Sequence, residues 1–216
     1  SIAWREAKAR ELEINASFYV LIDLSKSFFE EKTKTEMAHT LDQVNVALLE
    51  LSRRHPSPAI FSFLPINEIS LGSKPICTAV LRLTVFGGGK SENLGGIAIL
   101  KKRIQLEDFL NQCRDIVLLK KTKIFTDISG AVDLASRMAK GQSRGTKTMI
   151  IISDFFEDRL DGASTPELNL RGFKIGLIYG FRGAKAINPK LLDENVKAMR
   201  ERLLKAGAEK AEAHIE

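Results

Sequence analysis

The sequence predicts an α/β fold of three layers, with a mostly parallel central sheet, one antiparallel edge strand and helices on both faces. Short apolar runs alternate with stretches of helical spacing along the chain, and strands that alternate with helices form parallel sheets covered on both sides. The 216 residues suffice for one core, because chains of this size bury roughly 70% of their unfolded surface. We expect a single domain over 1–216, with its core in about 17–204, an N-terminal extension in 1–16 and a polar, frayed tail in 208–216.

Five or six strands are expected. Four apolar runs are typical of strands buried on both faces. These runs are Ser17–Ile22, Ala59–Leu64, Thr148–Ile152 and Phe173–Tyr179. Cys77–Phe86 differs, because its apolar residues alternate with Arg82 and Thr84. A period of two indicates a half-exposed strand, which we place at the edge and antiparallel to its neighbour. Gly87–Gly96 is glycine-rich and is predicted to be a turn or loop.

Four amphipathic helices separate these strands. They are predicted over Thr33–Arg54, Leu106–Val117, Asp127–Lys140 and Asn188–Leu204. Thr126 or Asp127 is suited to cap the third helix. Asn188 caps the last one, with Pro189 in its first turn, and Gly207 ends it.

Composition and charge exclude several classes of protein. The net charge of +6 is mildly basic. The Lys101–Arg103 and Lys120–Lys123 clusters contain no interleaved stacking aromatics, which favours a solvated face over a nucleic-acid partner. No apolar run approaches the roughly 20 residues that a membrane span needs. Cys77 and Cys113 are expected to be reduced and buried, with a single disulfide as the alternative.

The compartment is left open by the sequence. The chain begins with Ser1 and not with Met, so removal of an upstream signal would place the protein outside the cytoplasm. Of the two, a cytoplasmic location is slightly favoured.

Oxygen-bearing side chains follow the predicted strands at their carboxyl ends. Asp23, Ser25 and Ser27 come directly after the first strand, Thr126 precedes a helix, and Asp154 follows the Thr148–Ile152 strand. In doubly wound folds, ligands bind beyond this edge of the sheet. Carboxylates and hydroxyls without a soft ligand suit Mg²⁺ or Mn²⁺. The sequence therefore predicts a divalent-cation site made by these five residues.

This pattern resembles the metal-ion-dependent adhesion site of the von Willebrand factor A (vWA) domain family. Asp23-x-Ser25-x-Ser27, Thr126 and Asp154 match the family's D-x-S-x-S, threonine and aspartate in order and in structural context. The resemblance implies that the hydroxyls bind the metal directly, that the aspartates act mostly through water, and that a partner's Asp or Glu completes the metal shell. It covers about Ser17 to Leu204.

Two features depart from the family pattern. Phe155 follows Asp154 where the family usually has Gly, and the interval between Ser27 and Thr126 is longer than expected. The extra residues lie around Gly87–Gly96. The first departure changes the rim of the site without removing a ligand, and the second could cover or extend the ligand face.

We expect a non-catalytic, cation-dependent protein-binding module, in which Lys26, Phe155 and Phe156 surround the metal and contact the partner. Alternation predicts that one of the two phenylalanines points inward. A scaffold that binds its partner without metal, through its helices or basic patch, is one alternative. A phosphate-handling enzyme that uses Asp23 or the Gly87–Ser91 loop is another, although the loop lacks the first Gly of a Walker A motif and no nucleophile–base pair is evident.

Overall fold

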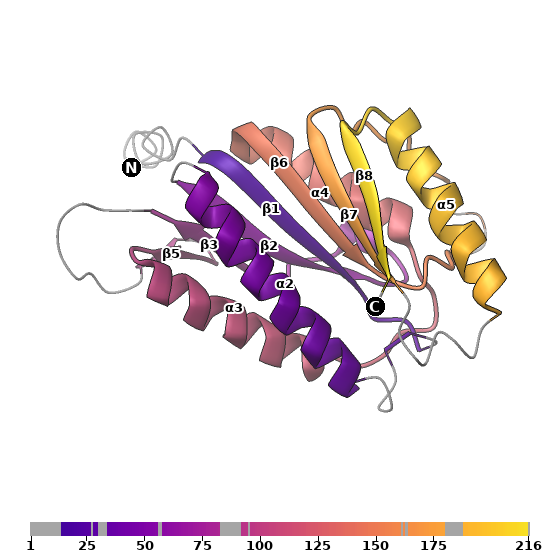
Figure 1. Ribbon diagram of the computed structural model, residues 1–216, viewed down its shortest axis with the longest axis horizontal. Coiled ribbons are helices and arrows are strands. Elements are labelled where there is room, and N and C mark those ends of the chain that lie inside the picture. The colour runs from indigo at the N-terminus through magenta and orange to yellow at the C-terminus, as the bar shows by residue number, and fades with distance from the viewer. Residues whose placement is uncertain are drawn as a thin grey trace.

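The computed structural model describes residues 14–26, 28–29, 34–55, 58–82, 92–94, 96–160, 162, 164–179 and 188–215. Within these ranges the chain forms one sheet of eight strands in the order β4-β5-β3-β2-β1-β6-β7-β8 (Figure 1). The strands are β1 (Ile14–Asp23), β2 (Ala59–Ile66), β3 (Cys77–Leu81), β4 (Glu92–Leu94), β5 (Ile97–Leu100), β6 (Ser143–Ile152), β7 (Phe173–Tyr179) and β8 (Lys210–Ile215).

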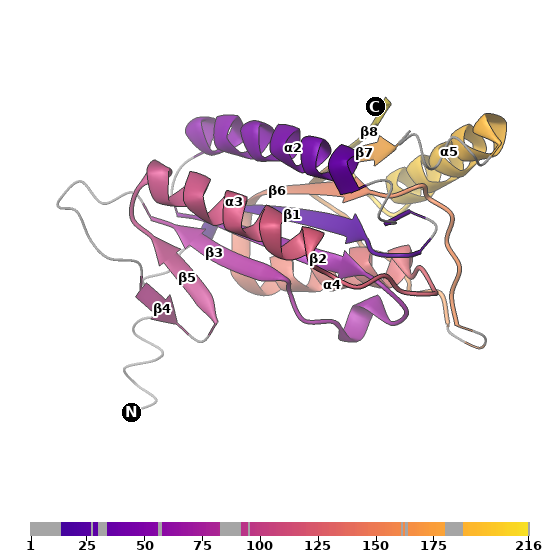
Figure 2. The same ribbon diagram turned by 90° about the horizontal axis from the view of Figure 1, so that it is seen from below.

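The helices lie in two layers. They are α2 (Lys34–Arg54), α3 (Arg103–Leu118), α4 (Ile128–Gln142) and α5 (Pro189–Lys205), with a short 3₁₀ turn η2 (Ser70–Gly72). Apolar residues of α2 and α3 pack into one core cluster, and those of α4 and α5 pack into a second one. Figure 2 shows α2 above the strands and α4 below them. None of the described helices is both long and apolar enough to cross a membrane.

The central strand β1 explains why its sequence is continuously apolar. Phe18, Val20 and Ile22 pack into the core beneath α2 and α3. The intervening Tyr19 and Leu21 pack into the core beneath α4 and α5. β1 pairs in parallel with β2 on one side and with β6 on the other. Both faces and both edges of the strand are therefore covered, and the predicted three-layer α/β fold is confirmed.

The prediction for the antiparallel strand is correct in direction and wrong in position. β3 is antiparallel to β2. It does not form the edge, because β5 pairs with its other side, and β4 lies beyond β5 in an antiparallel pair. β3 is also mostly buried, since α3 packs over it. The Gly87–Gly96 segment, predicted to be a loop, contains β4, while the part at 87–91 lies outside the described residues.

The C-terminal segment adds an edge strand. The prediction of a frayed tail is wrong, because Lys210–Ile215 forms β8 and pairs in parallel with β7. Ala211 is buried, and the exposed Lys210 and Glu212 side chains form an ion pair of 2.6 Å. An edge strand pairs on one side only and often carries charged side chains, so a mostly polar sequence can form β8.

The two cysteines form a disulfide, which corrects the expectation of reduced thiols. Cys77 on β3 and Cys113 on α3 have Cα atoms 6.0 Å apart, within the roughly 4.4–6.8 Å that a disulfide spans. The helical spacing correctly placed Cys113 on the apolar face of α3, where it is fully buried. The proximity of Cys113 to Cys77 could not be predicted from the sequence, because it depends on how α3 crosses the sheet.

Candidate functional site

Asp23 is the centre of the candidate site and lies at the carboxyl end of β1. Its side chain is fully buried. The Ser25 backbone N–H donates to Oδ1 over 2.8 Å, and the Ser153 hydroxyl donates to Oδ2 over 2.6 Å. Ser153 reaches Asp23 because β1 and β6 run in parallel and in register up to Ile22 and Ile152. Both carboxylate oxygens of Asp23 are thus held by hydrogen bonds from residues that follow β1 and β6.

The loop after β6 carries the second carboxylate. Asp154 is buried, and its Oδ1 accepts the Phe156 N–H over 3.0 Å. The Ser153 hydroxyl oxygen accepts the Phe155 N–H over 3.0 Å. Phe155, at this point of the loop, has a φ of 58°. This is the left-handed region of backbone conformation, which glycine adopts at lower energetic cost than other residues. Two side-chain-to-backbone hydrogen bonds therefore hold the loop in a conformation that its sequence disfavours.

Thr126 is brought to the same edge by backbone pairing between loops. The Lys26 N–H donates to the Lys123 carbonyl, and the Lys123 N–H donates to the Leu24 carbonyl, each over 2.8 Å. Thr126 in turn exchanges backbone hydrogen bonds with Asp158. The loop before α4 is therefore tied to the loop after β1 on one side and to the loop after β6 on the other. Thr126 and Ser25 are both buried beside these ties.

The two carboxylates influence each other electrostatically. The pKa of Asp23 is raised from 3.8 to about 7, first by burial and then by the nearby charge of Asp154, while hydrogen bonds from Ser153 and Ser25 act in the opposite direction. A divalent cation beside the pair would favour the ionised form of both groups and oppose these two effects. The residues present, two carboxylates and at least two buried hydroxyls, thus fit Mg²⁺ or Mn²⁺ by type.

Two predicted elements fall outside the described residues. They are Ser27, the last hydroxyl of the D-x-S-x-S motif, and the Gly87–Ser91 loop. Within the described part of the chain, no group of three or more His, Cys, Asp and Glu side chains is placed to hold a metal. The predicted site does not need three such side chains, because three of its five predicted ligands are the hydroxyls of Ser25, Ser27 and Thr126.

Asp127 caps α4, which settles the choice between Thr126 and Asp127. Its Oδ1 accepts the Gly130 N–H over 2.9 Å and Arg159 Nε over 2.8 Å. Its Oδ2 accepts the Ser70 N–H over 3.1 Å. A Cβ at Gly130 would overlap this carboxylate. Glycine is thus required at position 130 for Asp127 to cap the helix and to hold η2 and Arg159 beside it.

The rim of the site differs in part from the prediction. Phe156 is 50% exposed, whereas Phe155 is 3% exposed and packs into the core beneath α4 and α5. The expectation of one inward and one outward phenylalanine is met, and Phe155 no longer counts as a contact residue. Lys26 is exposed. Ile124 is 74% exposed on the loop that carries Thr126 and adds an apolar rim residue.

Lysines gather beside this rim. A pocket of about 370 Å³ is lined by four lysines, by Asn67 and by apolar residues that include Leu24 and Ile76. The lysines are Lys74, Lys120, Lys121 and Lys123. No Asp or Glu is among the described residues of the lining. Because Lys123 is hydrogen-bonded to the loop of Ser25, this lysine pocket adjoins the candidate metal site.

Sequence reasoning missed several residues of this edge. Ser153 is not among the predicted site residues, although its hydroxyl donates a hydrogen bond to Asp23. Arg159 and Glu157 also support the α4 loop, as the Ser129 N–H donates to Glu157 Oε1 over 2.7 Å. Their signal in the sequence is weak, because a single polar residue in a loop has many alternative roles. Lys74 is separated from the lysine cluster by more than 40 positions in the sequence and only the fold brings it there.

Comparisons with known proteins give distant structural likenesses. No family model matches the sequence, and no curated protein matches it. A von Willebrand factor type A structure from Catenulispora acidiphila overlaps with a TM-score of 0.49 at 15% identity, covering 94% of this chain and 39% of that chain. An aerotolerance-related membrane protein from Bacteroides fragilis overlaps at 0.42 and 11% identity, covering 94% and 92% of the two chains.

A third likeness is to the pilus adhesin SpaC from Lactobacillus rhamnosus GG. Its TM-score is 0.46 at 10% identity, and the overlap covers 93% of this chain and 28% of the adhesin. This chain thus spans well under half the length of the Catenulispora structure and of the adhesin. At such overlaps the likeness gives no evidence about function.

Proposed function

We propose that the protein is a protein-binding module whose partner docks at the carboxyl edge of the sheet in a manner that depends on Mg²⁺ or Mn²⁺. One observation carries the proposal. Four residues from three separate parts of the chain are at most 3% exposed, and the loops that carry or follow them are tied together by backbone hydrogen bonds. They are Asp23 at the end of β1, Ser25, Thr126 and Asp154. Two buried carboxylates close together are costly unless their charge is compensated, and a divalent cation would compensate it.

The residues divide into two roles under this proposal. The hydroxyls of Ser25, Ser27 and Thr126 hold the ion directly, and Asp23 and Asp154 orient them and neutralise part of its charge. When bound, the ion supplies an electrophilic position that a carboxylate of the partner can occupy. Neutral hydroxyl ligands leave that position more attractive to an anion than a fully carboxylate shell would.

The surroundings favour an acidic partner with apolar side chains. The lysine pocket contributes four ammonium groups next to the site. Phe156 and Ile124 expose apolar surface from two of its loops. Complementary charge speeds association, and a buried aromatic anchor supplies much of the binding energy. An Asp- or Glu-containing segment that covers Phe156 would use all three features.

Thermal melting tests the metal site directly. A ligand that binds only the folded state stabilises it by about 2.7 kcal/mol at a hundredfold excess over its dissociation constant. We expect Mg²⁺ or Mn²⁺ to raise Tm and EDTA to reverse the rise. The double change Ser25→Ala and Thr126→Ala should abolish the shift, whereas Ser164→Ala, which removes an exposed hydroxyl elsewhere, should preserve it. An equal metal shift in both variants would refute the site.

A labelled peptide rich in Asp and Glu tests the class of partner. Its binding should require Mg²⁺ and weaken when Lys120 and Lys121 are both changed to Gln, while a peptide with Gln in place of the acids should not bind. Binding that survives EDTA at full strength would place the docking surface away from the metal.

A further inference from the structure

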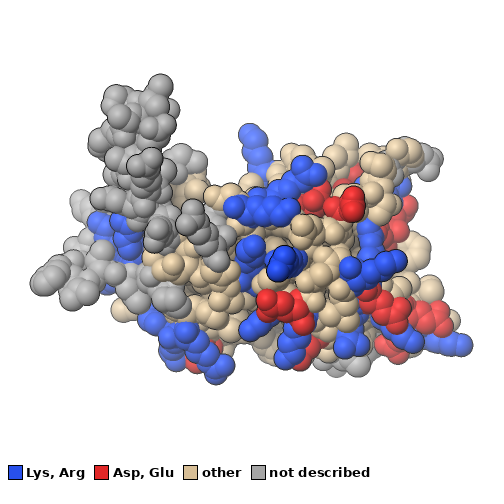
Figure 3. All heavy atoms as spheres, turned by 90° about the horizontal axis from the view of Figure 1, so that it is seen from above, with Lys and Arg blue, Asp and Glu red and all other residues tan. Residues whose placement is uncertain are grey.

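A second polar pocket lies near the amino ends of β6 and β7, the opposite edge of the sheet from the candidate metal site. Its volume is about 360 Å³. Its lining consists of Ser136, Lys140, Lys147, Asn169, Arg171 and Phe173. Figure 3 looks onto this side of the molecule, where Lys and Arg side chains gather over the middle of the surface.

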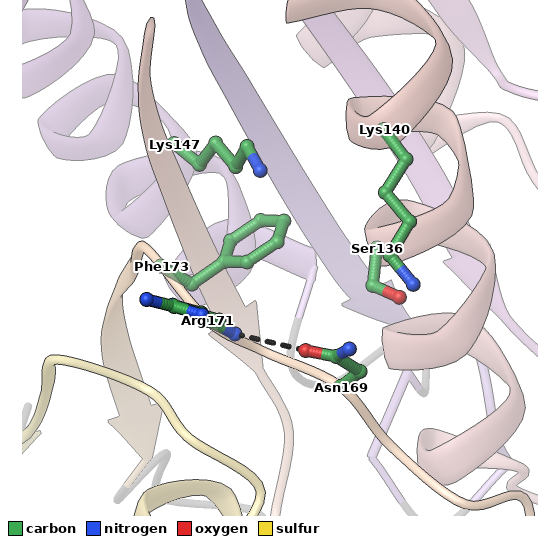
Figure 4. Close-up of a pocket in the computed structure, with 6 residues that line it drawn as sticks. All are labelled: Ser136, Lys140, Lys147, Asn169, Arg171 and Phe173. Carbon is green, nitrogen blue, oxygen red and sulfur yellow. Dashed lines mark hydrogen bonds between the residues drawn. The ribbon is translucent and has the colours of Figure 1, made fainter. Parts of the chain in front are cut away.

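Three elements position the polar groups of this pocket. Lys147 on β6 and Phe173 on β7 are cross-strand partners, and the Lys147 ammonium lies 5.7 Å from the centre of the Phe173 ring. Lys140 and Ser136 lie one turn apart on α4. Figure 4 shows the amines of Lys140 and Lys147 on opposite sides of the space, with the Ser136 hydroxyl beside Lys140.

Asn169 presents its amide nitrogen to the same space. Its Oδ1 accepts the backbone N–H of Arg171 over 3.4 Å, which leaves the NH₂ group directed away from Arg171 and toward Ser136 (Figure 4). The Arg171 guanidinium points to the other side and contributes positive charge from the rim. Ammonium, amide and hydroxyl groups are all hydrogen-bond donors, and no Asp or Glu is among the described residues of the lining.

We propose that this pocket binds a phosphate group. Phosphate carries close to two negative charges near neutral pH and offers only acceptor oxygens to a donor lining. The two lysines match that charge and Arg171 adds positive charge at the rim, whereas a carboxylate would neutralise only one of the lysines. Lys147 is held against an aromatic ring that is 1% exposed, so part of the binding geometry exists before the ligand arrives. Lys140 is also in the last turn of α4, where a cation is favourable without any ligand, so binding and not stability must be the readout.

The phosphate group has two possible sources, inorganic phosphate and a small phosphate monoester. Isothermal titration of the full chain with inorganic phosphate and with glycerol phosphate, in EDTA and at low ionic strength, distinguishes them. Equal affinities indicate that the pocket reads only the phosphate group, and tighter binding of the ester indicates that the remaining space holds an organic part. Acetate at the same concentration should bind at least tenfold more weakly.

Matched variants decide whether the pocket is the site. We expect Lys140→Gln and Lys147→Gln to weaken phosphate binding about tenfold each, as charged hydrogen bonds are worth roughly this much. The double change Lys190→Gln and Lys197→Gln on α5 removes two exposed lysines outside the pocket and should leave binding unchanged. If Lys147→Gln lowers Tm without ligand, the exposed Lys140 still provides the test. The absence of millimolar binding, or equal losses in the α5 control, would overturn the proposal.

Discussion

At the carboxyl ends of β1 and β6, buried carboxylates and hydroxyls converge, whereas near the amino ends of β6 and β7 the side chains present ammonium, amide and hydroxyl donors to a pocket. The carboxyl edge is built from three loops whose backbones are hydrogen-bonded to one another. The amino edge is built from side chains that stand on a helix and two strands or their adjoining turn.

The difference predicts which conditions affect each edge. Burial shifts the pKa of an ionisable group, so a buried carboxylate can change its protonation state near neutral pH. Salt screens the charge of a buried group only weakly. Exposed lysines such as Lys140 keep their charge and are screened. The carboxyl edge should therefore be sensitive to pH and the amino edge to ionic strength. Four perturbations distinguish the two edges, and the first of them tests the pH sensitivity of the carboxyl edge.

The pH dependence of stability should give the largest effect. The pKa of Asp23 is about 7 in the folded protein, against 3.8 for an aspartate in water, so between these values the unfolded chain binds fewer protons than the folded one. The free energy of unfolding should fall as pH rises from 4 to 7, by about 3 kcal/mol in metal-free protein. Urea unfolding across this range measures it.

Asp23→Asn is the control for that titration. It keeps the shape of the side chain and removes the charge, so the fall in stability between pH 4 and 7 should shrink. Saturating Mg²⁺ should also reduce the fall in the unchanged protein, because a bound cation favours the ionised carboxylate. A slope that is the same in Asp23→Asn would show that another group titrates.

Removal of an exposed rim side chain should give the next largest effect. Phe156→Ala is expected to weaken Mg²⁺-dependent binding of the acidic peptide by about 1–3 kcal/mol, the range for an aromatic anchor. Fluorescence anisotropy measures the change. Val46→Ala on α2 removes a side chain that is 61% exposed elsewhere and should have no effect. Phosphate binding should be unchanged in both variants.

A glycine in α4 provides a smaller perturbation of the carboxyl edge alone. Gly130→Ala would displace the Asp127 carboxylate from its cap and should lower stability by about 1 kcal/mol. Gly141→Ala is on the same helix and has open space at its Cβ, so it should stabilise by about 0.5–1 kcal/mol. A stabilising Gly130→Ala in thermal melts would contradict the account of Asp127.

The smallest expected effect is the coupling between the two edges. Sites that share no partners behave additively within about 0.5 kcal/mol. The stabilisation by Mg²⁺ and phosphate together should therefore equal the sum of the two separate shifts, once free Mg²⁺ is held constant. A deviation well above that limit would mean that the sheet couples the edges.

Much of the fold could be predicted from local sequence patterns, and the two errors in the sheet have different causes. Apolar runs such as Phe18–Ile22 identify strands because both of their faces are buried. Asn188 and Pro189 mark a helix start because their effects are local. The Asn188 side chain accepts the Lys190 N–H over 3.1 Å, and proline has no N–H of its own to satisfy in the first turn. β8 was missed because an edge strand has little apolar surface to leave a pattern. The position of β3 was missed because its second neighbour is set by a later segment.

The candidate site shows the same division. The topology of a parallel sheet was enough to expect Asp23 and Asp154 at one edge, since both follow strands of the same direction. The hydrogen bond from Ser153 to Asp23 depends on the register of two strands, and the burial of Phe155 depends on a positive φ. Neither register nor an unusual backbone angle can be inferred from residue types alone.

The Cys77–Cys113 disulfide makes the oxidation state of the chain depend on the compartment in which it folds. The bond closes a loop across a sequence separation of 36 between β3 and α3. Glutathione and thioredoxin keep such pairs reduced in the cytosol, and oxidising compartments preserve them. Rapid acid quenching of cells followed by thiol alkylation would leave both cysteines unlabelled in protein from an oxidising compartment and label both in protein from the cytosol. The mass added by alkylation of the denatured chain would thus show whether it came from a reducing or an oxidising compartment.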